Sequence, residues 1–161
     1  MSERNDLVES GRLESAVRVE DMDWRDICQI ERDYICRLVI EHDDELGLSE
    51  DTPFQVNQYM TLADDFFHGG AVTPDDLLTA RCEAIRLAED RPDRDSNDAK
   101  VFDLVSRNLF DDPELDSAQD PIWFLPIHCL DQLQPSFAHD YVSYFLRRVR
   151  AEHPEFIIDP G

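Results

Sequence analysis

Residues 73–92, TPDDLLTARCEAIRLAEDRP, carry the signals that begin and end an α-helix. Thr73 can cap the first turn, and Pro74 fits the first helical position because an N–H would be unpaired there anyway. Apolar and long side chains then recur at helical spacing until Pro92 interrupts the run. This stretch therefore predicts one helix, and the same pattern of cap, stripe and breaker divides the rest of the chain.

Upstream, the pattern predicts two more helices. Asp23 can cap a helix over 23–46, and Gly47 can end it in a left-handed turn. Thr52 can cap the next helix, which Gly69 and Gly70 should end. We expect this second helix to bury Phe54, Leu62 and Phe66.

Downstream, further helices are predicted from Ser96 onward. The first ends before Pro113, and the last spans 136–151. Between them, residues 120–133 are the most apolar segment, but Pro126 should kink this helix or divide it. The tail after the last helix, Glu155, Phe156, Ile157 and Ile158, is apolar enough to dock on the core.

Together these segments predict an all-α fold, an irregular bundle of five to seven helices around a single core. The chain lacks both sustained period-two alternation and Asn-Gly or Asp-Gly turns, so we expect little β-structure. Two parts are expected. Residues 1–20 form a polar N-terminal arm, either frayed or folded as a short helix from Leu7 to Val19, and residues 21–161 form the helical domain.

Charge is the feature of the composition that bears most on function. The chain carries 37 acidic and 15 basic residues, a formal charge of -22, and Lys100 is its only lysine. Such a field repels DNA, RNA and anionic membranes and attracts basic proteins. We therefore expect a basic protein partner, no direct nucleic acid and no membrane. Acidic composition is also typical of proteins from salt-loaded cytoplasm, which remains an alternative explanation.

Location is predicted from what the sequence lacks. No window approaches the roughly 18 apolar residues of a bilayer span, and the first residues have no signal pattern, so we expect a cytoplasmic protein. The four cysteines are scattered singly, which favours reduced thiols over a disulfide framework or a zinc site.

Several acids fall near predicted helix ends, where the helix dipole disfavours negative charge. Because helix stability does not explain them, we predict that they contact the partner, together with Trp24 at a helix start. If neighbouring helices alternate in direction, these acids gather at two opposite poles. The predicted partner-binding residues are Asp43, Asp44, Glu45, Asp64, Asp65, Asp111, Asp112 and Trp24.

Catalytic and metal-binding patterns are weaker. Asp65-x-x-His68 has the spacing of one helical carboxylate and histidine pair, but a di-iron bundle needs two such pairs. His128, Cys129 and Asp131, together with His139, are suitable zinc ligands by type, but their spacing matches no standard site. We therefore predict no catalytic residue, no metal and no cofactor, and keep a helical metal-dependent enzyme built on His68 and His128 as an alternative.

Two stretches suggest a family. Trp24-Arg25 and the stretch from Arg81 to Pro92, RCEAIRLAEDRP, together with size and charge, resemble the small acidic all-helical immunity proteins that neutralise bacterial polymorphic toxins. The resemblance implies tight one-to-one binding that blocks the active site or substrate channel of a toxin domain, without catalysis. A DNA mimic that inhibits a host DNA-binding protein is the other binding function consistent with this charge.

Overall fold

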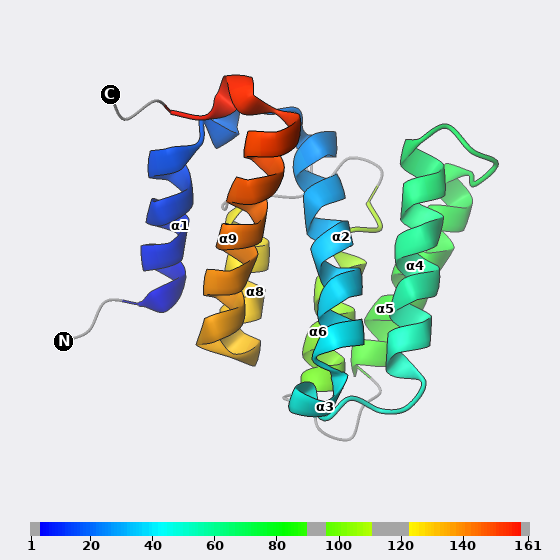
Figure 1. The fold of residues 1–161 in the computed structure, drawn as a ribbon. Helices are drawn as coiled ribbons and strands as arrows, with labels where there is room; N and C mark the ends of the chain where they lie inside the picture. The colour runs from blue at the N-terminus through cyan, green and yellow to red at the C-terminus, as the bar shows by residue number, and fades with distance from the viewer. Residues whose placement is uncertain (1–3, 90–95, 111–122, 159–161) are drawn as a thin grey trace. The chain divides into compact units, whose positions relative to one another are not determined.

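The computed structural model describes residues 4–89, 96–110 and 123–158 (Figure 1). Within these ranges the chain forms eight α-helices and two short 3-10 helices, with one isolated β-bridge, between Val17 and Ile157. The all-α prediction is confirmed. The helices form two compact units where one core was expected: unit 1 comprises residues 1–31 and 117–161, and unit 2 comprises residues 32–116.

Unit 1 is built from α1 (Asn5–Ala16), α8 (Phe124–Leu133) and α9 (Pro135–Glu152), with the first turns of α2 (Trp24–Glu41). The short helices η1 (Val19–Asp21) and η2 (Pro154–Phe156) complete it. α9 corresponds to the last predicted helix, and it buries one stripe made of Phe137, Tyr141, Phe145 and Val149. The tail docks as expected: Ile158 N donates to Ala16 O at 2.9 Å, and Arg18 N donates to Phe156 O at 2.8 Å.

Residues 5–16 form a packed helix in spite of their polarity, so of the two states considered for the N-terminal segment the helix is the one that forms. The reason is that its buried acids have partners. Asp6 accepts hydrogen bonds from Arg4 at 2.6 Å and lies 2.8 Å from His128 Nδ1. Glu9 accepts from Arg12 at 2.7 Å and lies 2.8 Å from His139 Nδ1. The polar side chains thus attach α1 to α8 and α9.

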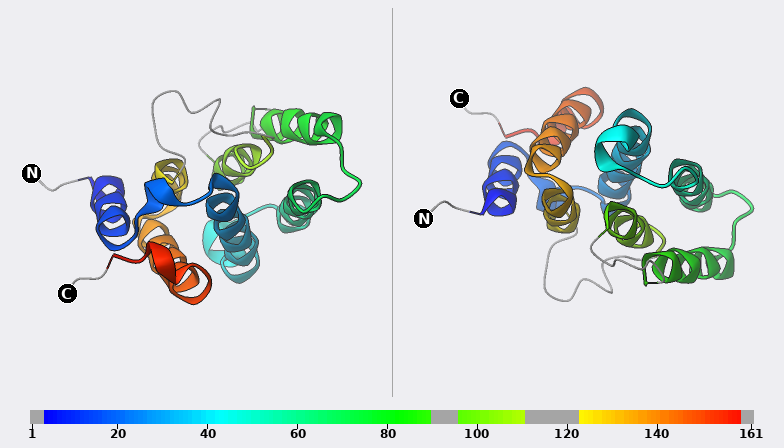
Figure 2. Two further views of the ribbon diagram at one scale, coloured as in Figure 1. Left: turned by 90° about the horizontal axis from the view of Figure 1, so that it is seen from above. Right: turned by 90° about the horizontal axis from the view of Figure 1, so that it is seen from below.

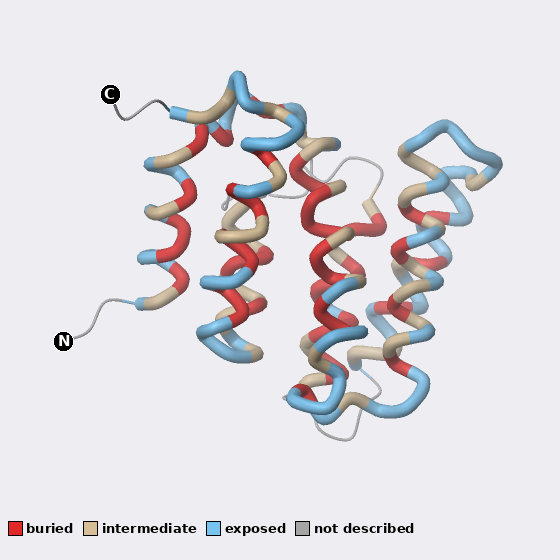
Figure 3. Tube along the Cα trace, viewed as in Figure 1, coloured by how far each residue is buried: buried red, intermediate tan, exposed pale blue. Residues whose placement is uncertain are grey.

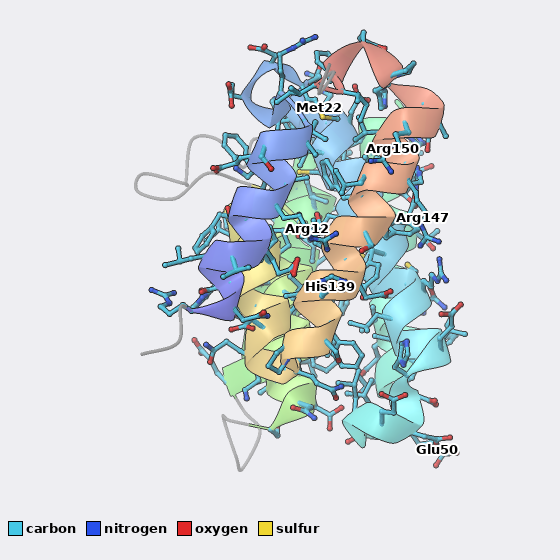
Figure 4. All side chains as sticks on the ribbon, turned by 60° about the vertical axis from the view of Figure 1, so that its left-hand side comes forward. Arg12, Met22, Glu50, His139, Arg147 and Arg150 are labelled. Carbon is cyan, nitrogen blue, oxygen red and sulfur yellow. The ribbon has the colours of Figure 1, made fainter. Side chains whose placement is uncertain are left out.

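Arg12 extends this attachment on the α9 side, where it lies beside His139 (Figure 4). Its guanidinium donates to the His139 carbonyl at 2.7 Å and to the Ser143 hydroxyl at 3.2 Å. Arg147, one turn beyond Ser143, and Arg150, two turns beyond it, lie exposed on the same helix. The two histidines that were candidate metal ligands, His128 and His139, are therefore engaged with carboxylates of α1.

Gly11 lies in the interior of α1, where a Cβ would meet no atom within 4 Å. A helical glycine costs about 0.5–1 kcal/mol relative to alanine, so Gly11→Ala should raise the free energy of unfolding by about that amount. Gly47→Ala should act in the opposite direction because Gly47 has φ +62. Urea denaturation followed by circular dichroism measures both, and a loss of stability in Gly11→Ala would contradict the prediction.

Unit 2 contains the rest of α2, the single turn α3 (Asp43–Leu46), and α4 (Thr52–Phe67), α5 (Pro74–Glu89) and α6 (Asn97–Ser106). The helix predicted over 23–46 is two helices, α2 and α3, because the backbone at His42 leaves helical geometry, with φ −123 and ψ 20. Gly47 ends α3 in the left-handed conformation, as predicted. The buried positions of α4 and α5 recur about once per turn, so one face of each helix is covered (Figure 3).

Helix starts were predicted with mixed success. Thr73 caps α5 as predicted, since Asp76 N donates to Thr73 Oγ1 at 3.1 Å. Asp76 completes a capping box by accepting from Thr73 N at 3.0 Å. Ser96 caps α6 by accepting from Ala99 N at 3.2 Å. The Thr52 cap is wrong, because its hydroxyl donates to Asp98 instead of capping α4.

Pro126 neither kinks nor divides α8, so the predicted kink or division at this proline is wrong. It is the third residue of the helix, among the first four positions whose N–H groups have no partner within a helix. No hydrogen bond is therefore lost there, and α8 continues to Leu133. Among the described helices, none combines the length and the apolar character that crossing a membrane requires.

Candidate functional site

Negative charge is concentrated in unit 2. Residues 32–116 contain 22 acidic and 8 basic residues, a formal charge of -14, whereas the other 76 residues carry 15 acidic and 7 basic residues. Within unit 2, no lysine or arginine occurs between Arg37 and Arg81, although ten acids do. This cation-free segment, residues 38–80, folds into the end of α2, α3, α4 and the start of α5.

Few acids of the cation-free segment are neutralised within the chain. Glu41 pairs with Arg37 and Asp64 with Arg32, while Glu45 contacts only a histidine, His42. In the ranges that the structure describes, the remaining acids form no ion pair: Asp43, Asp44, Glu50, Asp51, Asp65, Asp75 and Asp76. Their charge is therefore available to an external cation.

The acids predicted at the end of the first helix occupy a different place. The helical geometry is interrupted at His42, and a new helix, α3, begins at the next residue. The first turn of α3 therefore contains Asp43, Asp44 and Glu45, and the helix dipole favours acids at this position. The inference that these three residues oppose helix stability is corrected accordingly. All three remain exposed at the end of unit 2 where α4 begins and α5 ends (Figure 1).

The acids predicted at the end of α4 are in its last turn, but both have internal roles. Asp64 Oδ1 accepts from Arg32 Nε at 2.7 Å, and the Arg32 guanidinium also lies over the Phe67 ring, 4.8 Å from its centroid. Asp65 accepts from Val72 N at 3.1 Å and so shapes the α4–α5 loop. Asp64 is thus neutralised by the chain itself, whereas exposed Asp65 keeps its charge.

The remaining predicted partner-binding residues are Asp111, Asp112 and Trp24. Asp111 and Asp112 lie outside the described residues. Trp24 is the first residue of α2, half-buried, with the Arg25 guanidinium 5.2 Å from its ring centroid. It belongs to unit 1, so it shares no unit with the acids of α3 and α4.

A groove runs between α4 and α5 in unit 2. Its volume is about 1010 Å³. Seen along the helix axes, the ribbons of α4 and α5 both lie beside α6 (Figure 2). It is lined by Phe54, Asn57, Gln58, Tyr59, Thr61, Leu62, Asp65, Val72, Asp76, Thr79, Ala80 and Glu83. We call this feature the α4–α5 groove.

Among the described residues, carboxylates are the only charged side chains that line the α4–α5 groove. Asp65 and Asp76 lie where α4 ends and α5 begins, and Glu83 lies about two turns further along α5. Tyr59 donates to Glu83 at 3.4 Å. Burial and the adjacent Glu83 charge raise the pKa of Tyr59, so its hydroxyl stays protonated. The groove combines apolar surface with negative charge and offers no activated nucleophile.

Phe54 corrects the sequence prediction most directly. It was expected in the core, yet it is 66% exposed, and Leu62 and Phe66 are only half-buried. The buried stripe of α4 consists instead of Thr52, Val56, Met60 and Ala63. The larger apolar residues Phe54 and Leu62 therefore line the groove.

Sequence reasoning missed the groove because α4 carries two apolar stripes and only packing selects the buried one. It also missed Asp76 and Glu83 as residues of the groove. The absence of cations across residues 38–80 is the signal that could have indicated this surface.

The geometry of the described residues gives little support to a catalytic or metal-binding site. In the part of the chain that the structure describes, no group of three or more His, Cys, Asp or Glu side chains could hold a metal ion. Cys36 lies near Asp64 and Asp33, and burial followed by these charges raises the pKa of its thiol to about 11. A reactive thiolate is therefore disfavoured at this position.

Comparison with known proteins was made by sequence and by structure. No protein-family model, curated protein or solved structure matches this chain.

Proposed function

We propose that the chain is an acidic inhibitor of the immunity type, which binds a basic partner protein, a toxin domain, and thereby neutralises it. One observation carries the proposal: the 43 residues between Arg37 and Arg81 contain no cation, and most of their acids have no ion-pair partner among the described residues. A surface of this kind costs self-repulsion in the folded protein, which a bound cationic partner relieves.

Kinetics favour the same function. Complementary charge raises association rates toward about 10⁸–10⁹ M⁻¹s⁻¹ at low salt, and a toxin must be captured before it acts. Binding alone is sufficient for such an inhibitor. The α4–α5 groove adds apolar contact area to the charge, and apolar area buried at the centre of an interface slows dissociation.

The proposal is tested by charge reversal in the full chain. Asp44→Lys with Glu50→Lys changes two acids of the cation-free segment that have no ion-pair partner among the described residues. The matched control, Glu20→Lys with Glu155→Lys, makes the same change in net charge on exposed acids of unit 1. The proposal predicts that a neighbouring gene encodes the basic toxin domain, and association with that domain is measured by stopped flow at several salt concentrations.

We expect the unit 2 variant to associate at least about 10-fold more slowly at low salt, with a smaller salt dependence, and the control to change far less. In cells that co-express the toxin, the control should protect growth about as well as the wild-type chain, and the unit 2 variant should protect it less. Equal rates for the wild-type chain and both variants would reject an acidic inhibitor. Equal slowing in both variants would show that net charge acts without a defined surface.

A further inference from the structure

We infer that the α4–α5 groove receives one amphipathic α-helix of the partner, with its apolar stripe in the groove and lysines or arginines along both flanks. This inference rests on the proposed function in one respect, namely that the partner is basic. It adds the secondary structure of the recognised element and the place where it binds.

The dimensions of the groove fit a short helix. Its lining residues on α4 run from Phe54 to Asp65, a length of about 16 Å at a rise of 1.5 Å per residue. A docked helix would therefore contact the groove over about three turns. Three turns present three or four residues of one apolar stripe, the usual footprint of a helix bound in a groove.

The apolar part of the groove provides the anchoring surface. Phe54 is 66% exposed although it lies on a regular, well-packed helix, and Leu62, two turns further along, lies half-exposed on the same face. From the other side, Ala80 and the short side chain of Thr79 leave room for a ligand. An apolar face at helical spacing on the α4 wall, opposite small side chains on the α5 wall, is best covered by a third helix packed along the groove.

The charges select the partner. Asp65, Asp76 and Glu83 line the groove, whereas no described arginine or lysine does. None of the three acids forms an ion pair with the described residues. An acidic helix or a small anion would be repelled. A second copy of this groove would bring like charges together, which opposes dimerisation through this face. A helix flanked by lysine or arginine matches both the apolar stripe and the carboxylates.

The probe is an N-acetylated, C-amidated 18-residue peptide of leucine, alanine and arginine, with leucines at helical spacing and arginines on both flanks of that stripe. A peptide of the same composition, scrambled to remove the stripe, is the reference. Affinities for the full chain are measured by isothermal titration calorimetry at two salt concentrations. Circular dichroism reports whether the peptide becomes helical and whether each variant is folded.

Two variants test the groove, each with a matched control. Phe54→Ala is compared with Ile40→Ala, since Ile40 is similarly exposed, at 59%, but lies outside the groove. Glu83→Lys is compared with Glu89→Lys, the same change on the same helix outside the groove. We expect Phe54→Ala and Glu83→Lys each to weaken peptide binding at least about 10-fold, and both controls to change it less than about 2-fold.

The outcomes separate this inference from the proposed function. Equal binding of the ordered and scrambled peptides, or equal effects of each variant and its control, would overturn helix docking and leave acidic inhibition of the toxin intact. A shift from dimer to monomer in Phe54→Ala without peptide would overturn it in favour of self-association. If toxin binding fails the charge-reversal test while the peptide still binds by these criteria, the groove is retained and the toxin is not its partner.

Discussion

Replacing Asp98 by alanine should lower the free energy of unfolding by about 3 kcal/mol, a large share of the 5–15 kcal/mol typical of a domain. Asp98 is buried in the first turn of α6. Its carboxylate accepts from Ser49 N at 3.0 Å, from Ser49 Oγ at 2.7 Å and from Thr52 Oγ1 at 2.7 Å. Alanine would leave these donors without their acceptor, and the Thr52 hydroxyl is buried.

The effect should be specific to the buried carboxylate. Asp103→Ala on the same helix removes only an exposed pair with Arg107 and should cost less than about 0.5 kcal/mol. Thermal and urea unfolding are followed by circular dichroism, because both tryptophans belong to unit 1 and fluorescence would not report on unit 2. Equal stability of the two variants would contradict the role assigned to Asp98.

Acid should destabilise unit 1 through the two carboxylates of α1. Burial raises the pKa of Asp6, but hydrogen bonds from His128 and Arg4 outweigh it, so the pKa is lowered overall. Glu9 follows the same pattern with His139 and Arg12. A lowered pKa means that the folded state binds fewer protons than the unfolded chain. The stabilisation is therefore complete above the ordinary carboxyl pKa and is lost as the pH falls below about 4.

The double variant Asp6→Asn with Glu9→Gln isolates this contribution. It should lose about 2–4 kcal/mol at pH 7, because ionised acceptors make the stronger hydrogen bonds, and its stability should fall less steeply with acid. Glu14→Gln, an exposed acid of α1 that accepts only from Trp123, is the control. Tryptophan fluorescence measures urea unfolding from pH 7 to pH 3. An unchanged pH dependence in the double variant would contradict the prediction.

Local signals predicted the helices well. The capping box of Thr73 and Asp76 and the left-handed stop at Gly47 depend on neighbours within a few residues, so the sequence determines them directly. Thr52 shows the limit of such signals. A threonine before a proline suits a cap, but its hydroxyl bonds equally well with Asp98, 46 residues away, and the sequence does not reveal that distant acceptor.

The candidate site was predicted only in part. Asp65 was identified, whereas Phe54 was assigned to the core, since both apolar stripes of α4 satisfy helical periodicity and only tertiary contacts distinguish them. His128 and His139 could be read as metal ligands because their partners on α1 lie more than 120 residues away. Side chains that meet across such separations leave no trace in local spacing.

The cation-free segment has a consequence for protein turnover. Trypsin-like proteases hold lysine or arginine in an acidic specificity pocket, so they have no site to cut between Arg37 and Arg81. Even when α3 or α4 opens locally, these enzymes would release residues 38–81 only as one intact peptide. The segment that we propose captures a basic protein thus also lacks cleavage sites for an entire class of proteases.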